Sequence, residues 1–375
     1  MRRLVLLLST AVLPAATASA EVTLSGTARL GIGYGVLNNG DPWLEPTRTE
    51  TVDRGGAPVA VDTRLGAPDD ELRALSRVRF VFTGVGESDS GITFGASIRA
   101  DNAPSGGTGP TAASGQTAGS AFVAGAWGTL TYGDVDGADY QRVGDPIRNV
   151  TLTGLGDFNE LPFLSNGGGT DNDELQFLAD PDVRPTVRYD YDIAGFGLSV
   201  STDRDLDAVG VGAGYTLELG DGSVTFGAGY YDFSGFEGEI GYYGEVDVPD
   251  GEEWSASLRG TFGAFQAGIG FAAISAGDLG ELDVLTGGAG FAHEAWSVYA
   301  YYSAVVDGNA LFGEALDGRD SYGMSVQYDL GGGATVNMGV ARSYGADAVG
   351  APEDAQFAPE VEATTLADFG ISMAF

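Results

Sequence analysis

Few side chains in this sequence could carry out covalent chemistry. The 375-residue chain has no cysteine and a single histidine, His293, which lies in the short stretch Ala-His-Glu-Ala. A hydrolytic nucleophile needs a positioned base, most often a histidine, and no serine or aspartate can be paired with His293 from its spacing. We therefore expect a polar turn residue at this position, and we do not expect an enzyme.

A second group of residues could bind a metal ion. Asp171-Asn172-Asp173-Glu174 is a compact run of oxygen donors, which are the ligands that Ca²⁺ prefers. Its spacing does not match the EF-hand loop, and solvated surface charge explains the run equally simply. A Ca²⁺ site at Asp171, Asp173 and Glu174 therefore stays an open alternative, and no other cofactor is expected.

The third group is a set of charged residues that recur inside alternating segments. Every second residue of these segments is apolar, and the charged residues fall on the opposite parity. Successive side chains of a strand point to opposite faces of the sheet. The charged residues are therefore expected to share one polar face: Arg29, Arg77, Arg79, Arg99, Arg188, Glu218 and Arg259.

The elements that position these charges are predicted to be strands. Sixteen alternating segments can be written, from EVTLSGTARLGIGY (21–34) to TLADFGISMAF (365–375), and helices would need apolar residues every three or four positions. Most segments come as hairpins. VGVGAGYTLEL and VTFGAGYY, for example, flank Gly220-Asp221-Gly222, which is a strong signal for a tight turn.

The connections between these segments alternate in length. Short turns follow every second segment, whereas the other connections are mostly longer and acidic. Aromatic residues gather near the segment ends on the apolar parity, as the interfacial girdles of a membrane barrel require. The pattern predicts an all-β fold, a 16-stranded antiparallel transmembrane β-barrel, over a soluble β-sandwich.

Composition and the N-terminus set the cellular context. All 18 basic residues are arginine against 53 acidic ones, and the formal net charge of −35 disfavours binding to nucleic acid. Residues 1–20 combine a basic start, an apolar run and an Ala-Ser-Ala cleavage motif, which is typical of a secretory signal peptide. We expect cleavage before Glu21 and a single barrel unit over residues 21–375.

The last segment is expected to close the barrel. Backbone polar groups in lipid must be paired, so a membrane sheet cannot keep an open edge. TLADFGISMAF must then pair with EVTLSGTARL, and its apolar face from Phe369 to Phe375 is expected to contact lipid. An even strand count also brings both termini to the periplasmic side.

Several pieces of the sequence carry a family resemblance. EVTLSGTARLGIGYG, FVAGAWGTLTYGDVDGAD, RYDYDIAGFGLSVS and the terminal Phe375 together resemble the trimeric porins of Gram-negative outer membranes, especially the alphaproteobacterial branch. The resemblance implies a homotrimer in outer-membrane lipid and lipopolysaccharide that passes small hydrophilic solutes. It also implies that Phe375 is part of the signal for membrane insertion.

The resemblance further implies a constriction. In such porins the third long loop, here about residues 134–184, folds into the barrel and faces basic residues on the opposite wall. The basic side would be Arg29, Arg77, Arg79 and Arg99, and Arg188, Glu218 and Arg259 would be other lumen-facing residues. The acidic side would be Asp134, Asp136, Asp139, Asp145, Asp157 and Glu160. The stretch LPFLSNGGGTDNDE lacks the Pro-Glu-aromatic-Gly-Gly motif of enterobacterial porins, so the carboxylate at the loop tip stays unassigned.

Alternatives to a general diffusion porin remain at this stage. A substrate-selective porin for sugars or anions would need an aromatic track along the lumen, and inward aromatic residues are few. A secreted, acidic, Ca²⁺-binding β protein would show a short fixed repeat, whereas the present segments share alternation but no fixed period.

Overall fold

The structure is a computed structural model of the chain. It describes residues 21–34, 47–54, 57–64, 72–101, 119–133, 135–147, 151–152, 155, 161, 163, 165, 185–204, 206–240, 244–277, 280–309, 320–344 and 363–375. Residues 1–20, on which the expected signal peptide falls, lie outside the described residues. Among the described residues no helix is long and apolar enough to cross a membrane.

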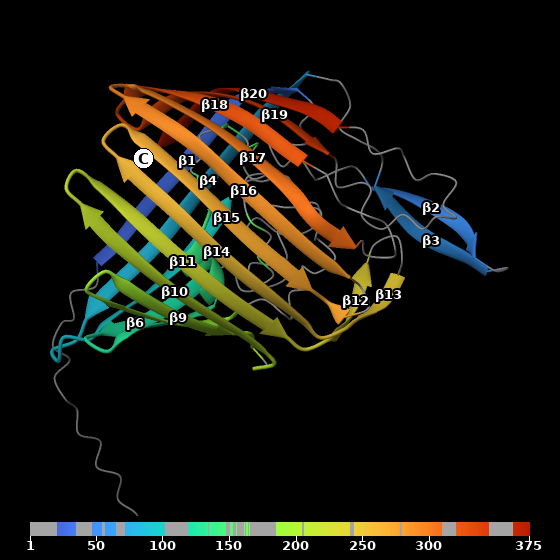
Figure 1. Ribbon diagram of the computed structural model, residues 1–375, viewed down its shortest axis with the longest axis horizontal. Coiled ribbons are helices and arrows are strands. Elements are labelled where there is room, and N and C mark those ends of the chain that lie inside the picture. Colours follow the sequence, from blue (N-terminus) through green and yellow to red (C-terminus); the bar gives the residue numbers. More distant parts are fainter. Residues whose placement is uncertain are drawn as a thin grey trace, which may run out of the picture.

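Sixteen antiparallel strands form a closed barrel, in agreement with the prediction (Figure 1). Around the barrel the strands follow the order β1-β20-β19-β18-β17-β16-β15-β14-β11-β10-β9-β8-β7-β6-β5-β4. Their bounds are β1 (Glu21–Tyr34), β4 (Leu72–Glu87), β5 (Thr93–Asp101), β6 (Gly119–Gly125), β7 (Gly128–Gly133), β8 (Val187–Ile193), β9 (Phe196–Thr202), β10 (Ala208–Leu219), β11 (Gly222–Phe233), β14 (Gly251–Phe262), β15 (Phe265–Ser275), β16 (Glu281–His293), β17 (Trp296–Asn309), β18 (Asp320–Gly331), β19 (Ala334–Tyr344) and β20 (Ala363–Ala374).

Two further hairpins were not expected from the sequence. β2 (Thr47–Arg54) pairs with β3 (Ala57–Arg64), and β12 (Phe236–Ile240) pairs with β13 (Gly244–Val248). Both are separate two-stranded sheets, and in Figure 1 they lie beyond the barrel end that is opposite the short turns. They occupy two of the long connections, so the long loops carry local structure of their own.

The barrel closes between its first and last strands, as predicted. β1 pairs with β20 from Thr27 opposite Ala374 to Tyr34 opposite Ala367. At the terminal residue, the Phe375 amide donates to the Gly26 carbonyl at 3.0 Å, and the Gly26 amide donates to the Phe375 carbonyl at 2.7 Å. The last backbone groups of the chain are therefore paired within the barrel, as an apolar surrounding requires.

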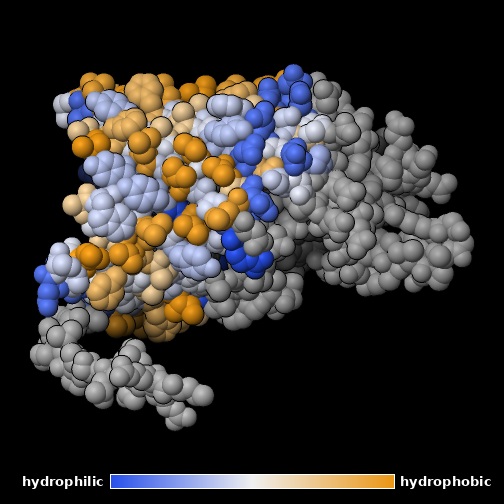
Figure 2. All heavy atoms as spheres, turned by 90° about the horizontal axis from the view of Figure 1, so that it is seen from below, coloured by the Kyte–Doolittle hydropathy of each residue, from blue (hydrophilic) through white to orange (hydrophobic). Residues whose placement is uncertain are grey.

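The two faces of the barrel wall differ in polarity. Along β10, the apolar side chains Val209, Val211 and Leu217 are exposed on the outside, and the intervening residues face the interior. Apolar residues are spread over the outer surface of the described barrel, and hydrophilic ones gather mainly toward one rim (Figure 2). An exposed apolar exterior is the surface that a lipid bilayer covers.

Aromatic pairs lie at both rims of this apolar surface. Near the short turns, the ring centroids of Trp296 and Tyr328 are 4.6 Å apart. Toward the opposite rim, the rings of Tyr230 and Trp254 are 4.4 Å apart. Aromatic side chains at the two ends of an apolar band match the girdles of membrane barrels, so this sequence-based expectation is confirmed.

Candidate functional site

The connection between β7 and β8 enters the barrel. Its helix α1 (Ala138–Val143) packs against β9, β10, β11 and β14. Beyond the helix, the chain contacts the inner wall successively on more distant strands: Ile147 lies at β16 and Leu152 at β1. The third long loop therefore folds inward, as the resemblance implied. We call its described part, residues 135–147, 151–152, 155, 161, 163 and 165, the inner loop.

Glycines on the inner face of the wall make room for the inner loop. A Cβ atom at Gly212 would overlap the Ala138 carbonyl, and a Cβ atom at Gly268 would overlap the Pro146 carbonyl. A side chain at either position would push the loop backbone off the wall, because only glycine permits so close an approach. The alternating glycines of β10, β11 and β15 thus form a seat for the inner loop.

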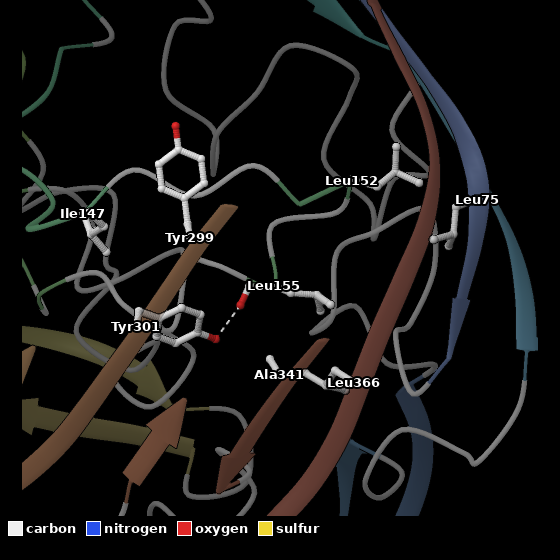
Figure 3. Close-up of a cluster of buried hydrophobic side chains, with 8 residues drawn as sticks. All are labelled: Leu75, Ile147, Leu152, Leu155, Tyr299, Tyr301, Ala341 and Leu366. Carbon is white, nitrogen blue, oxygen red and sulfur yellow. Dashed lines mark hydrogen bonds between the residues drawn. The ribbon is translucent and has the colours of Figure 1, made fainter. Parts of the chain in front are cut away.

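An apolar cluster fixes the far part of the inner loop (Figure 3). Its buried members come from the loop and from four strands, β4, β17, β19 and β20: Leu75, Ile147, Leu152, Leu155, Tyr299, Tyr301, Ala341 and Leu366. The Tyr301 hydroxyl donates to the Leu155 carbonyl at 2.7 Å, drawn as the dashed line in Figure 3. Burial of these side chains stabilises the loop by the hydrophobic effect, and the tyrosine satisfies a loop carbonyl that water does not reach.

A second apolar cluster holds the near part of the loop. Val143, Leu161 and Phe163 are buried with Ala272 of β15, and the Tyr140 ring meets the Phe163 ring edge-on at 4.9 Å. The Ser257 hydroxyl of β14 donates to the Val143 carbonyl at 2.7 Å. The first cluster thus packs the middle of the inner loop against the wall, and the second packs segments on either side of it.

The four arginines expected on the basic side share one wall. Arg29 of β1 stands opposite Arg77 of β4, and Arg79 and Arg99 follow on β4 and β5. Their face is the inner one, because Leu75 on the same parity of β4 packs against the inner loop. In the strand order this wall lies about half-way round the barrel from the strands that carry α1.

Arg29 has a contact that the sequence did not reveal. Its guanidinium donates to the Leu152 carbonyl of the inner loop at 2.8 Å. The inner loop therefore reaches the arginine wall itself, and at this point the arginine binds loop backbone. The constriction roles of Arg77, Arg79 and Arg99 stay predictions.

Of the expected acidic residues, Asp136, Asp139 and Asp145 are described. The Asp136 side chain is half exposed, with its carboxylate 4.0 Å from the Arg188 guanidinium, and Asp145 is partly buried. The other residues expected on the acidic side lie outside the described residues: Asp134, Asp157 and Glu160. The residues of the possible Ca²⁺ site also lie outside them: Asp171, Asp173 and Glu174.

Asp139 corrects the sequence-based expectation of a carboxylate facing the channel. It is 0% exposed, because α1 presses it against β11, where a Cβ atom at Gly229 would lie 2.6 Å from the Asp139 Cβ. Burial raises the pKa of its carboxyl from 3.8 to about 6, against a smaller lowering by the Ser165 hydroxyl. Asp139 is therefore part of the packing between loop and wall.

The remaining lumen-facing expectations fall on the inner face. Arg188 contacts Asp190 at 2.9 Å and donates to the Asp136 carbonyl at 2.9 Å. Arg259 lies on the parity of Ser257, beside Gly144 of the inner loop. Glu218 is exposed near the turn at the end of β10, on the parity of its inward glycines. His293 is exposed at a turn, with the Glu294 carboxylate 4.0 Å away.

Sequence reasoning missed the polar residues that fasten α1. The side chain of Arg142 contacts Asp192, Asp190 and Ser199 of the wall, and the Ala138 amide donates to the Ser201 hydroxyl at 2.9 Å. The available signal was glycine on the polar parity, as in VGVGAG and FGAG, because small inward residues mark where another segment lies against the wall.

The geometry defines a channel-forming β-barrel whose interior is polar and is crossed by an inner loop. The sequence profile of the Gram-negative porin family matches residues 5–348 of the chain. A porin of Rhodobacter capsulatus is 28% identical over 346 residues, which cover 86% of this chain and 94% of that relative.

Solved structures share the fold. A porin structure refined at 1.8 Å resolution has 22% sequence identity and a TM-score of 0.60, covering 95% of this chain and 100% of that one. A Rhodopseudomonas blastica porin variant has 19% identity, a TM-score of 0.51 and the same coverage. The chain belongs to the Gram-negative porin family, and it is an outer-membrane general diffusion porin of the alphaproteobacterial type.

Proposed function

We propose that ions and small hydrophilic solutes cross this porin between the inner loop and the wall that carries Arg77, Arg79 and Arg99. The observation that carries this proposal is the placement of the arginine wall across the barrel from α1. Guanidinium groups stay charged at any relevant pH, and Asp136 and Asp145 belong to the inner loop. Fixed charges of opposite sign on two sides of a narrow passage orient dipolar solutes and disfavour apolar ones.

Stepwise conductance of purified protein in a planar bilayer tests this function. We expect discrete current steps and, in liposome swelling, rates that fall smoothly as uncharged solutes become larger. Saturable uptake of one sugar or anion would instead favour a substrate-selective porin. Absence of steps from protein with the heat-dependent gel mobility of a folded barrel would contradict the proposal.

The proposed assembly is a homotrimer in outer-membrane lipid and lipopolysaccharide. An outward apolar groove of about 310 Å³ lies beside the closure of the barrel, with Ile32, Leu72, Met324, Met338 and Phe369 among its lining. A groove of this kind supports contact with an apolar surface of a neighbouring subunit. Cross-linking or native mass spectrometry of the detergent-solubilised protein would show three subunits if the proposal holds.

Export is proposed to remove residues 1–20. The observation behind this is the order of basic, apolar and Ala-Ser-Ala segments at the N-terminus. Sequencing of the mature N-terminus should return Glu21 as the first residue. Catalysis is not part of the proposed function, and Ca²⁺ at Asp171, Asp173 and Glu174 stays a proposal that calorimetry with Ca²⁺ tests.

A further inference from the structure

Arg142 connects the inner loop to the wall through several polar contacts. Its guanidinium donates to the Asp192 carboxylate at 2.6 and 3.4 Å and to the Leu198 carbonyl at 2.8 Å. Its Nε donates to the Ser199 hydroxyl at 2.7 Å. These contacts join one residue of α1 to both β8 and β9.

The wall around Arg142 is itself organised. The Ser199 hydroxyl donates to Asp190 at 2.6 Å, and Asp190 also accepts from Arg188 at 2.9 Å. The Arg142 guanidinium lies 3.9 Å from the same Asp190 carboxylate. Ser199 and Asp190 are therefore held in place by other residues of the wall, so little conformational entropy is lost when Arg142 contacts them.

Two glycines of the wall leave room for the Arg142 side chain. A Cβ atom at Gly197 would overlap the Arg142 guanidinium, and a Cβ atom at Gly212 would lie 2.9 Å from the Arg142 Cγ. The Arg142 side chain is 11% exposed, whereas its partner Asp192 is 70% exposed. The arginine is thus enclosed between α1 and the wall and is not an open lumen charge.

The helix that carries Arg142 depends on such contacts. α1 has six residues and no side-chain cap at its N-terminus, and Arg142 lies in its last turn. A helix this short does not persist by itself in water. A cation in the last turn also interacts favourably with the helix dipole, so Arg142 stabilises the helix and its attachment together.

We propose that Arg142 is a positioning residue that latches the inner loop to the β8–β9 wall and so sets the open width of the channel. The inference deepens the proposed function and rests on it. When the latch is broken, α1 leaves its seat for part of the time and enters the path of ions. The open channel then shows additional, smaller conductance levels.

The test compares single-channel recordings of the wild type, Arg142→Ala and Asp192→Asn. Both substitutions remove the ion pair, but they change the charge of the lumen in opposite directions. A latch predicts that both raise the time spent in reduced-conductance levels. The rise should be on the order of tenfold for Arg142→Ala, which removes every hydrogen bond of the guanidinium, and smaller for Asp192→Asn, because the exposed Asp192 carboxylate is partly screened by solvent. A pure charge effect predicts that the two variants move conductance and reversal potential in opposite directions and leave these levels unchanged.

Two further variants complete the design. Arg142→Ala combined with Asp192→Asn should raise the reduced levels no more than Arg142→Ala alone, because both single changes remove the same interaction. Arg342→Ala is the matched control, since Arg342 lies on the outward parity of β19, with Met338 and Val340. Its recordings should match the wild type.

The outcomes separate the latch from the channel function. The latch is overturned if the wild type shows current steps but Arg142→Ala and Asp192→Asn leave the reduced-conductance levels unchanged. It is also overturned if the two substitutions have additive effects on these levels in the double variant. Either result leaves the proposed function intact. Absence of steps in the wild type overturns the proposed function. If Arg142→Ala does not reach the folded gel mobility, Asp192→Asn decides the test, because the exposed Asp192 side chain can be changed without opening a cavity.

Discussion

At the residue scale, the proposed transport path depends most directly on the arginines of the inner wall. Arg77 and Arg79 lie on the inner face of β4, beside Arg29 and Leu75. A permanent guanidinium charge in a narrow, low-dielectric passage repels cations and raises the local concentration of anions. Ion selectivity should therefore depend on these side chains individually.

Replacing Arg77 and Arg79 together by alanine should shift selectivity toward cations. Two positive charges leave the passage, while the acidic residues of the inner loop remain. We expect the cation-to-anion permeability ratio to rise roughly severalfold, as read from reversal potentials in a salt gradient. Arg342→Ala serves as the control, and unchanged reversal potentials in the double variant would place both arginines away from the constriction.

Asp139 gives the molecule a pH dependence of defined sign. Its carboxyl has a pKa of about 6 in the folded protein and 3.8 ordinarily, because it is fully buried between α1 and the wall. Between these pH values the folded protein retains a proton that the unfolded chain has lost. This group therefore makes the folded state less stable as pH rises from about 4 to about 6.

Asp139→Asn should remove that dependence. The amide is nearly isosteric with the protonated carboxyl and carries no charge at any pH. We expect the midpoint of thermal unfolding of the variant to match that of the wild type near pH 4 and to exceed it above pH 6. The quantity to measure is the difference between the two midpoints at each pH, because the contributions of other titrating groups cancel in it. A difference that is constant with pH would show that Asp139 does not titrate in this range.

At the element scale, the strands were largely predictable and the inner loop was not. The alternation along segments such as EVTLSGTARLGIGY places the apolar side chains on one face of the strand. Neighbouring strands must pair in a register that keeps this face outward, and this constraint also applies to the pairing that closes the barrel. Helix α1 has no comparable signal. Its sequence ADYQRV is short and has no side-chain cap, and its place depends on wall residues that are distant in sequence.

The glycine seat is the element-scale feature that holds the inner loop. Gly212→Ala should destabilise the protein, since the new methyl group would overlap the Ala138 carbonyl. Overpacking of this kind costs about 1–3 kcal/mol, which chemical unfolding in detergent would detect. At Gly84 of β4 a Cβ atom meets nothing within 4 Å, so Gly84→Ala should leave the unfolding free energy nearly unchanged. Equal effects at the two positions would contradict a seat.

At the scale of the whole molecule, the terminal residue Phe375 takes part in closing the barrel. Phe375 exchanges two backbone hydrogen bonds with Gly26, and its ring meets Phe80 edge-on at 5.6 Å. We also propose, from the family resemblance, that Phe375 is part of a membrane-insertion signal, a role that closure of the barrel does not require. The sequence could predict the pairing because an open edge is forbidden in lipid, but it could not predict the ring contact.

Phe375→Ala should lower the amount of porin in the outer membrane more than Phe369→Ala does. Both residues belong to the last segment and expose an aromatic ring to lipid, so their loss should affect unfolding in detergent to a similar extent. Quantitative immunoblots of outer-membrane fractions would show the difference if Phe375 is read during insertion. Equal membrane levels of the two variants would assign Phe375 a packing role alone.

A water-filled barrel that the inner loop narrows should conduct more current when the loop is removed. This expectation is tested most directly by the single-channel conductance of the wild type and of a variant in which residues 138–163 are replaced by a short glycine-serine linker. We expect larger current steps for the variant, since helix α1 and the loop members of both apolar clusters are removed from the lumen. Equal steps in the two proteins, with both folded by gel mobility, would contradict this expectation.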